Sequence, residues 1–157
     1  KNGLNLDQLQ ASFVYSLAMV GGVVGTILFG RYANKLGYMK TSILCTGLAC
    51  LSVFLLSLQG VYNVTLVPHL IILSLTTFPI SSLMQSSLSS LSSPQQRDIL
   101  LGLYLTIGFG VSSLWSSLIG LSIDLYGTFV PAWYGMAGLG LLALGLQLLA
   151  YKRRKTN

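Results

Sequence analysis

Four polar side chains recur at helical spacing within one long apolar run of the sequence: Ser74, Thr77, Ser81 and Gln85. Steps of three and four residues place side chains on one face of an α-helix. Hydroxyl and carboxamide groups can bind a small molecule by donating and accepting hydrogen bonds. We interpret these four residues as a candidate solute-contacting stripe. The competing interpretation is that the serines and threonine only pack, bonded to their own helix.

The sequence offers little for bond-making chemistry. It contains one histidine, two cysteines and three acidic residues, Asp7, Asp98 and Asp124. The acidic residues lie at the predicted ends of apolar segments, so no acidic pair, metal-ligand cluster or activated nucleophile is evident. Cys45 and Cys50 are five positions apart in one predicted helix and point in different directions, which favours packing over a disulfide. We therefore predict no enzyme activity, no metal site and no cofactor.

Composition indicates which elements carry these residues. Of 157 residues, 53% are hydrophobic and 8% are charged, and the mean hydropathy is +0.74. Soluble domains carry about 25% charged residues, so a soluble enzyme, a nucleic-acid binder and a secreted disulfide scaffold are excluded. Charged residues border uncharged runs of 23, 56, 25 and 27 residues. A membrane-spanning helix needs about 20 apolar residues, so the 56-residue run must turn back once, near residues 59–63.

We predict a single all-α transmembrane domain over residues 1–157. Its five membrane-spanning helices are expected near residues 12–30, 41–58, 67–91, 99–123 and 131–151. Five crossings place the two ends of the chain on opposite sides of the membrane, and eight of the nine lysines and arginines then share one side. These eight are Arg31, Lys35, Lys40, Arg97 and residues 152–155.

The positive-inside rule puts that side in the cytoplasm and the amino terminus outside. We predict an integral, multi-pass protein of the plasma membrane. The net charge of +6 is explained by these topological anchors, so no nucleic-acid partner is needed.

A short pattern occurs twice, 90 residues apart: glycine, three residues, asparagine or aspartate, two residues, glycine. The copies are Gly30, Asn34, Gly37 and Gly120, Asp124, Gly127. Each lies where a predicted helix ends, and the copies are expected on opposite sides of the membrane, as in an inverted-topology repeat. Pairing the first helix with the fourth makes a three-helix unit, so we expect one further helix before Lys1 and a six-helix bundle.

Residues 30–40, Gly-Arg-Tyr-Ala-Asn-Lys-Leu-Gly-Tyr-Met-Lys, resemble the cytoplasmic loop motif of the major facilitator superfamily. The positions that fit are Gly30, Ala33, Lys35, Gly37 and Lys40. Asn34 replaces the acidic residue of the motif, and Tyr38 and Met39 stand where basic residues are usual. Residues 94–98 resemble the link between the tenth and eleventh helices of the family. The resemblance covers the chain as helices eight to twelve, most of a six-helix carboxyl-terminal half.

The resemblance implies a secondary transporter that moves a small organic solute by alternating access. Its partners would be the lipid bilayer and the missing amino-terminal half of the same polypeptide. The loop motif would act as a cytoplasmic gating latch, with candidate residues Gly30, Arg31, Asn34, Lys35 and Gly37. The alternative interpretation is that the basic residues only fix the orientation of the chain in the membrane.

Two further expectations follow from the family. The polar stripe would lie on the tenth helix, which lines the cavity. Small-residue faces on the first and fourth predicted helices would be sliding surfaces against the other half of the transporter. They comprise Gly21, Gly22 and Gly25 on the first helix, and Gly108 and Gly110 with Ser112, Ser113, Ser116 and Ser117 on the fourth. The alternative function is a non-transporting polytopic membrane subunit or assembly scaffold, whose polar stripe would be buried and unreactive.

Overall fold

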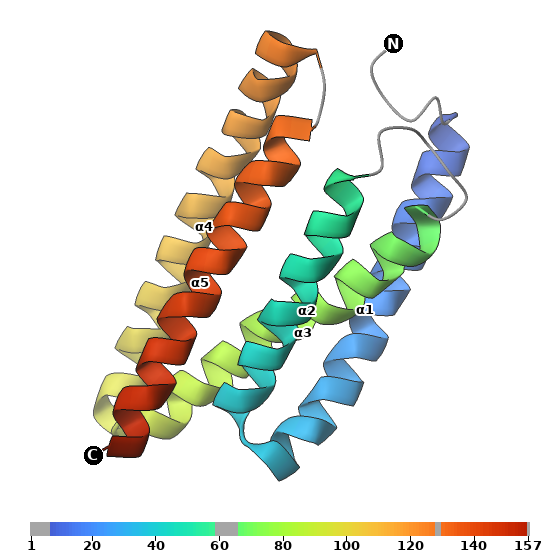
Figure 1. Cartoon of the computed structure of the whole chain (residues 1–157). Helices are drawn as coiled ribbons and strands as arrows, with labels where there is room; N and C mark the ends of the chain where they lie inside the picture. Colours follow the sequence, from blue (N-terminus) through green and yellow to red (C-terminus); the bar gives the residue numbers. More distant parts are fainter. Residues whose placement is uncertain (1–6, 59–65, 128–129, 157) are drawn as a thin grey trace.

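The computed structural model describes residues 7–58, 66–127 and 130–156, with side chains described up to residue 153. These residues form five long helices joined by short connections, and no strand occurs in the described ranges. The helices are α1 (Gln8–Leu36), α2 (Tyr38–Ser57), α3 (Leu66–Leu91), α4 (Pro94–Tyr126) and α5 (Val130–Thr156) (Figure 1). Each is long and apolar enough to cross a membrane. The predicted fold class, an all-α bundle of five such helices, is confirmed.

Two helices extend well beyond the expected spans, and their ends explain why. α1 begins at a capping box in which the Gln8 N–H donates to Asp7 Oδ1 at 2.7 Å and the Asp7 N–H to Gln10 Oε1 at 3.3 Å. It then continues to Leu36, through most of the predicted loop. α4 already begins at Pro94, because proline at the first helical position needs no N–H partner. Residues 94–98 are therefore the first turn of a helix, and the expected link is shorter than predicted.

The helices pack in an uneven arrangement. α1 packs mainly against α3, while α2 packs against both α3 and α5. α3 runs obliquely across α1 and α2, and α4 touches α3 and α5 only lightly (Figure 1). None of the residues of α4 is buried. Large apolar side chains such as Phe109, 73% exposed, point outward along the bundle, as expected for a surface in contact with lipid.

The contact between α1 and α3 is made through small residues. A Cβ atom added at Gly22 would lie 2.6 Å from Cγ of Phe78, and one at Gly25 would lie 2.7 Å from the carbonyl carbon of Leu75. Close backbone approach of this kind is the main way in which membrane helices pack without a hydrophobic driving force. The expectation that Gly21, Gly22 and Gly25 slide against another half of the protein is therefore wrong, because this face is buried against α3.

Charge separates the two ends of the bundle. The end of α1, the start of α2, the connection from α3 to α4 and the end of α5 lie at the same end of the bundle (Figure 1). Among the described side chains, this basic end carries six basic ones, Arg31, Lys35, Lys40, Arg97, Lys152 and Arg153, and one acidic one, Asp98. Asp7 and Asp124 lie at the opposite end, where α1 begins and α4 finishes. The charge asymmetry deduced from the sequence thus corresponds to two physical ends of the described structure.

Candidate functional site

The polar stripe lies on the face of α3 opposite the buried residues of that helix. The buried residues of this helix beyond its first turn, Thr76, Pro79, Leu83 and Ser87, recur at the same helical spacing as the stripe. Ser74, Thr77, Ser81 and Gln85 fall on the opposite face, since successive residues turn by about 100°. Ser81 is exposed, and the other three are half-buried. The four side chains therefore share one face of α3, as the spacing predicted.

Hydrogen bonds within the stripe are local. The Gln85 Nε2 group donates to Ser81 Oγ at 3.1 Å, one turn earlier. The Thr77 hydroxyl donates to the Leu73 carbonyl of its own helix at 2.8 Å, which is the arrangement of the competing packing interpretation. Gln85 and Ser81 are therefore the paired polar groups of the stripe.

Pro79 lies in the middle of α3 without ending the helix and is fully buried. Because proline has no N–H, the Leu75 carbonyl four residues earlier loses its intrahelical partner. The same Leu75 carbonyl lies against Gly25 of α1, which has no side chain to hold the two helices apart. The weak point that proline introduces into α3 is thus placed directly at the α1–α3 contact.

An open cavity of about 460 Å³ lies at the basic end of the stripe, between α3 and α4. We call it the Arg97 cavity. It is lined by Tyr38, Gln85, Ser86, Ser89, Ser90, Arg97 and Leu101. Arg97 is the charged residue of this lining, and its guanidinium gives the cavity positive character. Gln85 therefore joins the stripe to a polar opening at the basic end.

The five candidate gating residues occupy the last two turns of α1 and the turn that follows. Arg31, Asn34 and Lys35 are exposed, and Gly30 has open space where a side chain would be. Asn34 accepts a long hydrogen bond of 3.5 Å from the Tyr38 hydroxyl. Gly37 alone connects α1 to α2, with φ 90° and ψ 145°, a conformation open almost only to glycine.

The second copy of the repeat forms a matching helix end at the other end of the bundle. Gly127 has φ 65°, and its N–H donates to the Ile123 carbonyl at 2.8 Å. The Gly37 N–H makes the equivalent bond to the Ala33 carbonyl, also at 2.8 Å. Gly37 and Gly127 are the glycines with positive φ in the described parts of the chain. The final glycine of each copy is thus the one that the backbone requires.

Comparison with known families decides the identity of this bundle. The model of the family described as Major Facilitator Superfamily matches residues 1–157. The chain belongs to the major facilitator superfamily. No curated protein and no solved structure matches it. The resemblance seen in the loop motif is confirmed, and this member of the superfamily is a multi-pass integral membrane protein of a transporter family rather than of an enzyme family.

Within this superfamily member, sequence reasoning missed a buried polar contact. The Thr46 hydroxyl of α2 donates to Gln147 Oε1 of α5 at 3.2 Å, and both side chains are buried. The available signal was Gln147 itself, a carboxamide within the uncharged run of residues 125–151. A buried carboxamide in a membrane helix needs a hydrogen-bond partner. For Gln147 of α5, Thr46 of α2 provides that partner.

Proposed function

We propose that this chain forms most of the carboxyl-terminal half of a secondary transporter that moves a small organic solute by alternating access. One observation carries the proposal. The polar stripe Ser74, Thr77, Ser81 and Gln85 lies on the face of α3 opposite its buried residues, with Ser81 exposed and the other three half-buried. A transport path needs polar groups on a face that water and solute can reach, and a polar face in lipid alone would be costly.

The surface of α4 supports the same proposal. This helix has no buried residue, yet it carries a run of small residues, Gly108, Gly110, Ser112 and Ser113. Small residues allow close approach of another helix, and those of α4 have no neighbour where a Cβ would be at Gly108 and Gly110. We assign this uncovered side to the amino-terminal half of the same polypeptide, which would close the solute path against α3 and α4.

The chemistry of the stripe favours a solute held by hydrogen bonds. Its four side chains are uncharged, and each hydroxyl or carboxamide can both donate and accept. Arg97 adds positive charge at the basic end of the path. We infer a small polar organic solute, bound at the stripe without an ion pair to these helices.

We place the basic end of the bundle in the cytoplasm of a cell whose plasma membrane holds the protein, with the start of α1 outside. The gating latch then consists of Gly30, Arg31, Asn34, Lys35 and Gly37 at the cytoplasmic end of α1. The exposure of Arg31, Asn34 and Lys35 leaves them available to a partner helix. Because Asn34 is uncharged, the latch holds by hydrogen bonds and by the basic residues beside it.

Cysteine accessibility in the full-length protein tests the proposal. Cys45 and Cys50 are first replaced by alanine, and single variants such as Ser81→Cys and Gln85→Cys are then treated with a membrane-impermeant thiol reagent. Vesicles of both orientations are compared, so that access from each side is measured separately. We expect each stripe position to react from both sides, because alternating access opens the same site in turn.

Matched controls lie on the packed face of the same helix. Thr76→Cys and Leu83→Cys should stay unreactive from either side, since both native side chains are buried. A stripe that is as unreactive as these controls, in protein that inserts normally, would contradict transport. It would support the alternative function, a non-transporting membrane subunit or assembly scaffold.

A further inference from the structure

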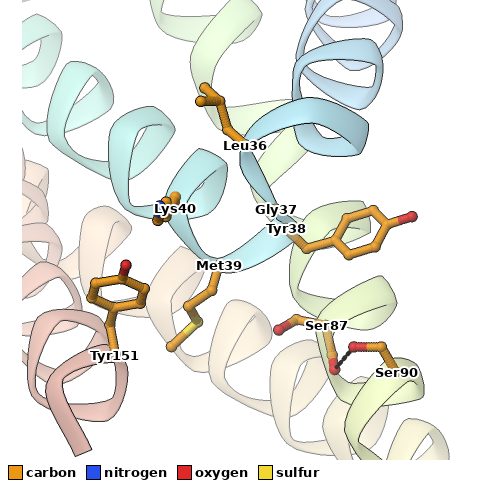
Figure 2. Close-up of a pocket in the computed structure, with 8 residues that line it drawn as sticks. All are labelled: Leu36, Gly37, Tyr38, Met39, Lys40, Ser87, Ser90 and Tyr151. Carbon is orange, nitrogen blue, oxygen red and sulfur yellow. Dashed lines mark hydrogen bonds between the residues drawn. The ribbon is translucent and has the colours of Figure 1, made fainter. Parts of the chain in front are cut away.

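A second cavity, of about 350 Å³, lies at the basic end beneath the turn between α1 and α2. We call it the Gly37 cavity. The residues that matter for its chemistry are Tyr38, Met39, Lys40, Ser87, Ser90 and Tyr151, from α2, α3 and α5 (Figure 2). Lys40 and Tyr151 lie on one side of it and the two serines on the other, with the Met39 side chain between them (Figure 2).

The start of α2 gives this cavity an excess of hydrogen-bond donors. The first N–H groups of a helix have no intrahelical partner, and no side chain caps them at Gly37. The N–H groups of Tyr38, Met39 and Lys40 therefore lie at the positive end of a 20-residue helix dipole. The ammonium group of Lys40 adds a full positive charge, and none of the described residues that line the cavity is acidic.

An independent observation points to a ligand. Ser87 is only 5% exposed, and Figure 2 shows its hydroxyl pointing toward Met39, into the cavity. Among the hydrogen bonds that side chains make in the described residues, Ser87 takes part only through its carbonyl, which accepts from Ser90 Oγ at 2.8 Å. The Ser87 hydroxyl therefore has no protein partner within the described ranges and is free to donate a hydrogen bond to an acceptor bound in the cavity.

We propose that the Gly37 cavity binds a phosphate group, presented either by an anionic lipid or by a free phosphate. The donors comprise the backbone N–H groups at the start of α2, the Lys40 ammonium and the hydroxyls of Ser87 and Tyr151. Such a set exceeds what the two oxygens of a carboxylate accept and suits a tetrahedral anion at a helix N-terminus. The cavity is larger than a phosphate group, and the flexible Met39 side chain can move aside. This binding does not depend on the transport proposed above.

The test uses the full-length protein and two variants with matched controls. Ser87→Ala removes the unpaired hydroxyl, and Lys40→Gln removes the charge. Ser52→Ala is the control for burial, because Ser52 is also 5% exposed but bonds to the Leu48 carbonyl of α2. Lys35→Gln is the control for charge, since Lys35 is at the same end of the bundle and outside the cavity lining.

One arm measures thermal unfolding in detergent as inorganic phosphate is titrated against chloride at constant ionic strength. The other arm compares bilayers of phosphatidylcholine with bilayers that also contain phosphatidic acid. A ligand that binds only the folded state raises the unfolding temperature, so each series yields an apparent Kd. We expect Ser87→Ala and Lys40→Gln to raise that Kd about tenfold, and both controls to leave it unchanged.

The two arms distinguish the source of the phosphate. Stabilisation by inorganic phosphate that both variants lose supports a free phosphate, and stabilisation only by phosphatidic acid that both lose supports a lipid headgroup. Absence of any stabilisation, or stabilisation that all four variants share equally, would overturn the proposal. If Ser87→Ala fails to fold, the exposed Lys40→Gln variant still decides between these outcomes.

Discussion

Gly25 offers a sharp quantitative test of how this bundle is held together. It lies in α1 where that helix meets the Leu75 carbonyl of α3, and Pro79 has already deprived this carbonyl of its helical hydrogen bond. The substitution Gly25→Ala adds a single methyl group at the contact. A Cβ there would be 2.7 Å from the Leu75 carbonyl carbon, whereas ordinary contact begins at 3.4 Å.

The expected cost follows from this geometry. The clashing atoms belong to the backbone and cannot rotate away, so α1 and α3 must separate by about 1 Å and lose packing along the contact. Overpacking of this kind costs about 1–3 kcal/mol. Alanine also favours the helix over glycine by about 1 kcal/mol, which offsets part of that cost.

Gly30→Ala is the matched control, because Gly30 lies in the same helix with open space around its missing Cβ. It keeps the gain in helix propensity without the clash. We therefore expect Gly25→Ala to be less stable than Gly30→Ala by about 1–3 kcal/mol when the full-length protein is unfolded by SDS in mixed micelles. Equal stability of the two variants would refute the close approach of α1 to α3.

Two further predictions use the same unfolding assay. In a double-mutant cycle, Thr46→Val and Gln147→Leu should be coupled by about 0.6 kcal/mol, the average for hydrogen bonds between membrane helices, and strictly additive effects would contradict the bond. Gly37→Ala and Gly127→Ala should each destabilise the protein by about 1 kcal/mol or more because their φ angles are positive. Gly120 lies inside α4 with open space around its missing Cβ, so Gly120→Ala should not destabilise the protein. Equal stability changes for all three substitutions would contradict the two helix ends described here.

The sequence predicted the number of helices and the face of the polar stripe. Both depend on patterns that tertiary packing does not alter: uncharged runs long enough to cross a bilayer, and helical spacing in Ser74, Thr77, Ser81 and Gln85. The helix ends were less predictable. Charged and polar residues such as Arg31 and Lys35 suggested a loop, but nothing in them prevents a helix, and α1 continues until Gly37.

The partners of each helix could not be predicted. Gly21, Gly22 and Gly25 indicate that another helix approaches closely, but small residues do not specify which helix it is. The contact of Thr46 with Gln147 joins residues 101 positions apart, and one sequence contains no signal for such a pair. The cavity beneath Gly37 likewise depends on α1, α2, α3 and α5 meeting, so nothing in the sequence indicates that its donors form a group.

The brevity of the connections at the basic end has a mechanical consequence. One residue, Gly37, separates α1 from α2, and Ser92 and Ser93 alone separate α3 from α4. Consecutive Cα atoms are about 3.8 Å apart, so the facing ends of α1 and α2 stay within about 8 Å of each other in any conformation. Any displacement of the end of α1 must therefore also displace the start of α2. Each pair of helices joined at this end can therefore change its crossing angle, but the two joined ends cannot separate.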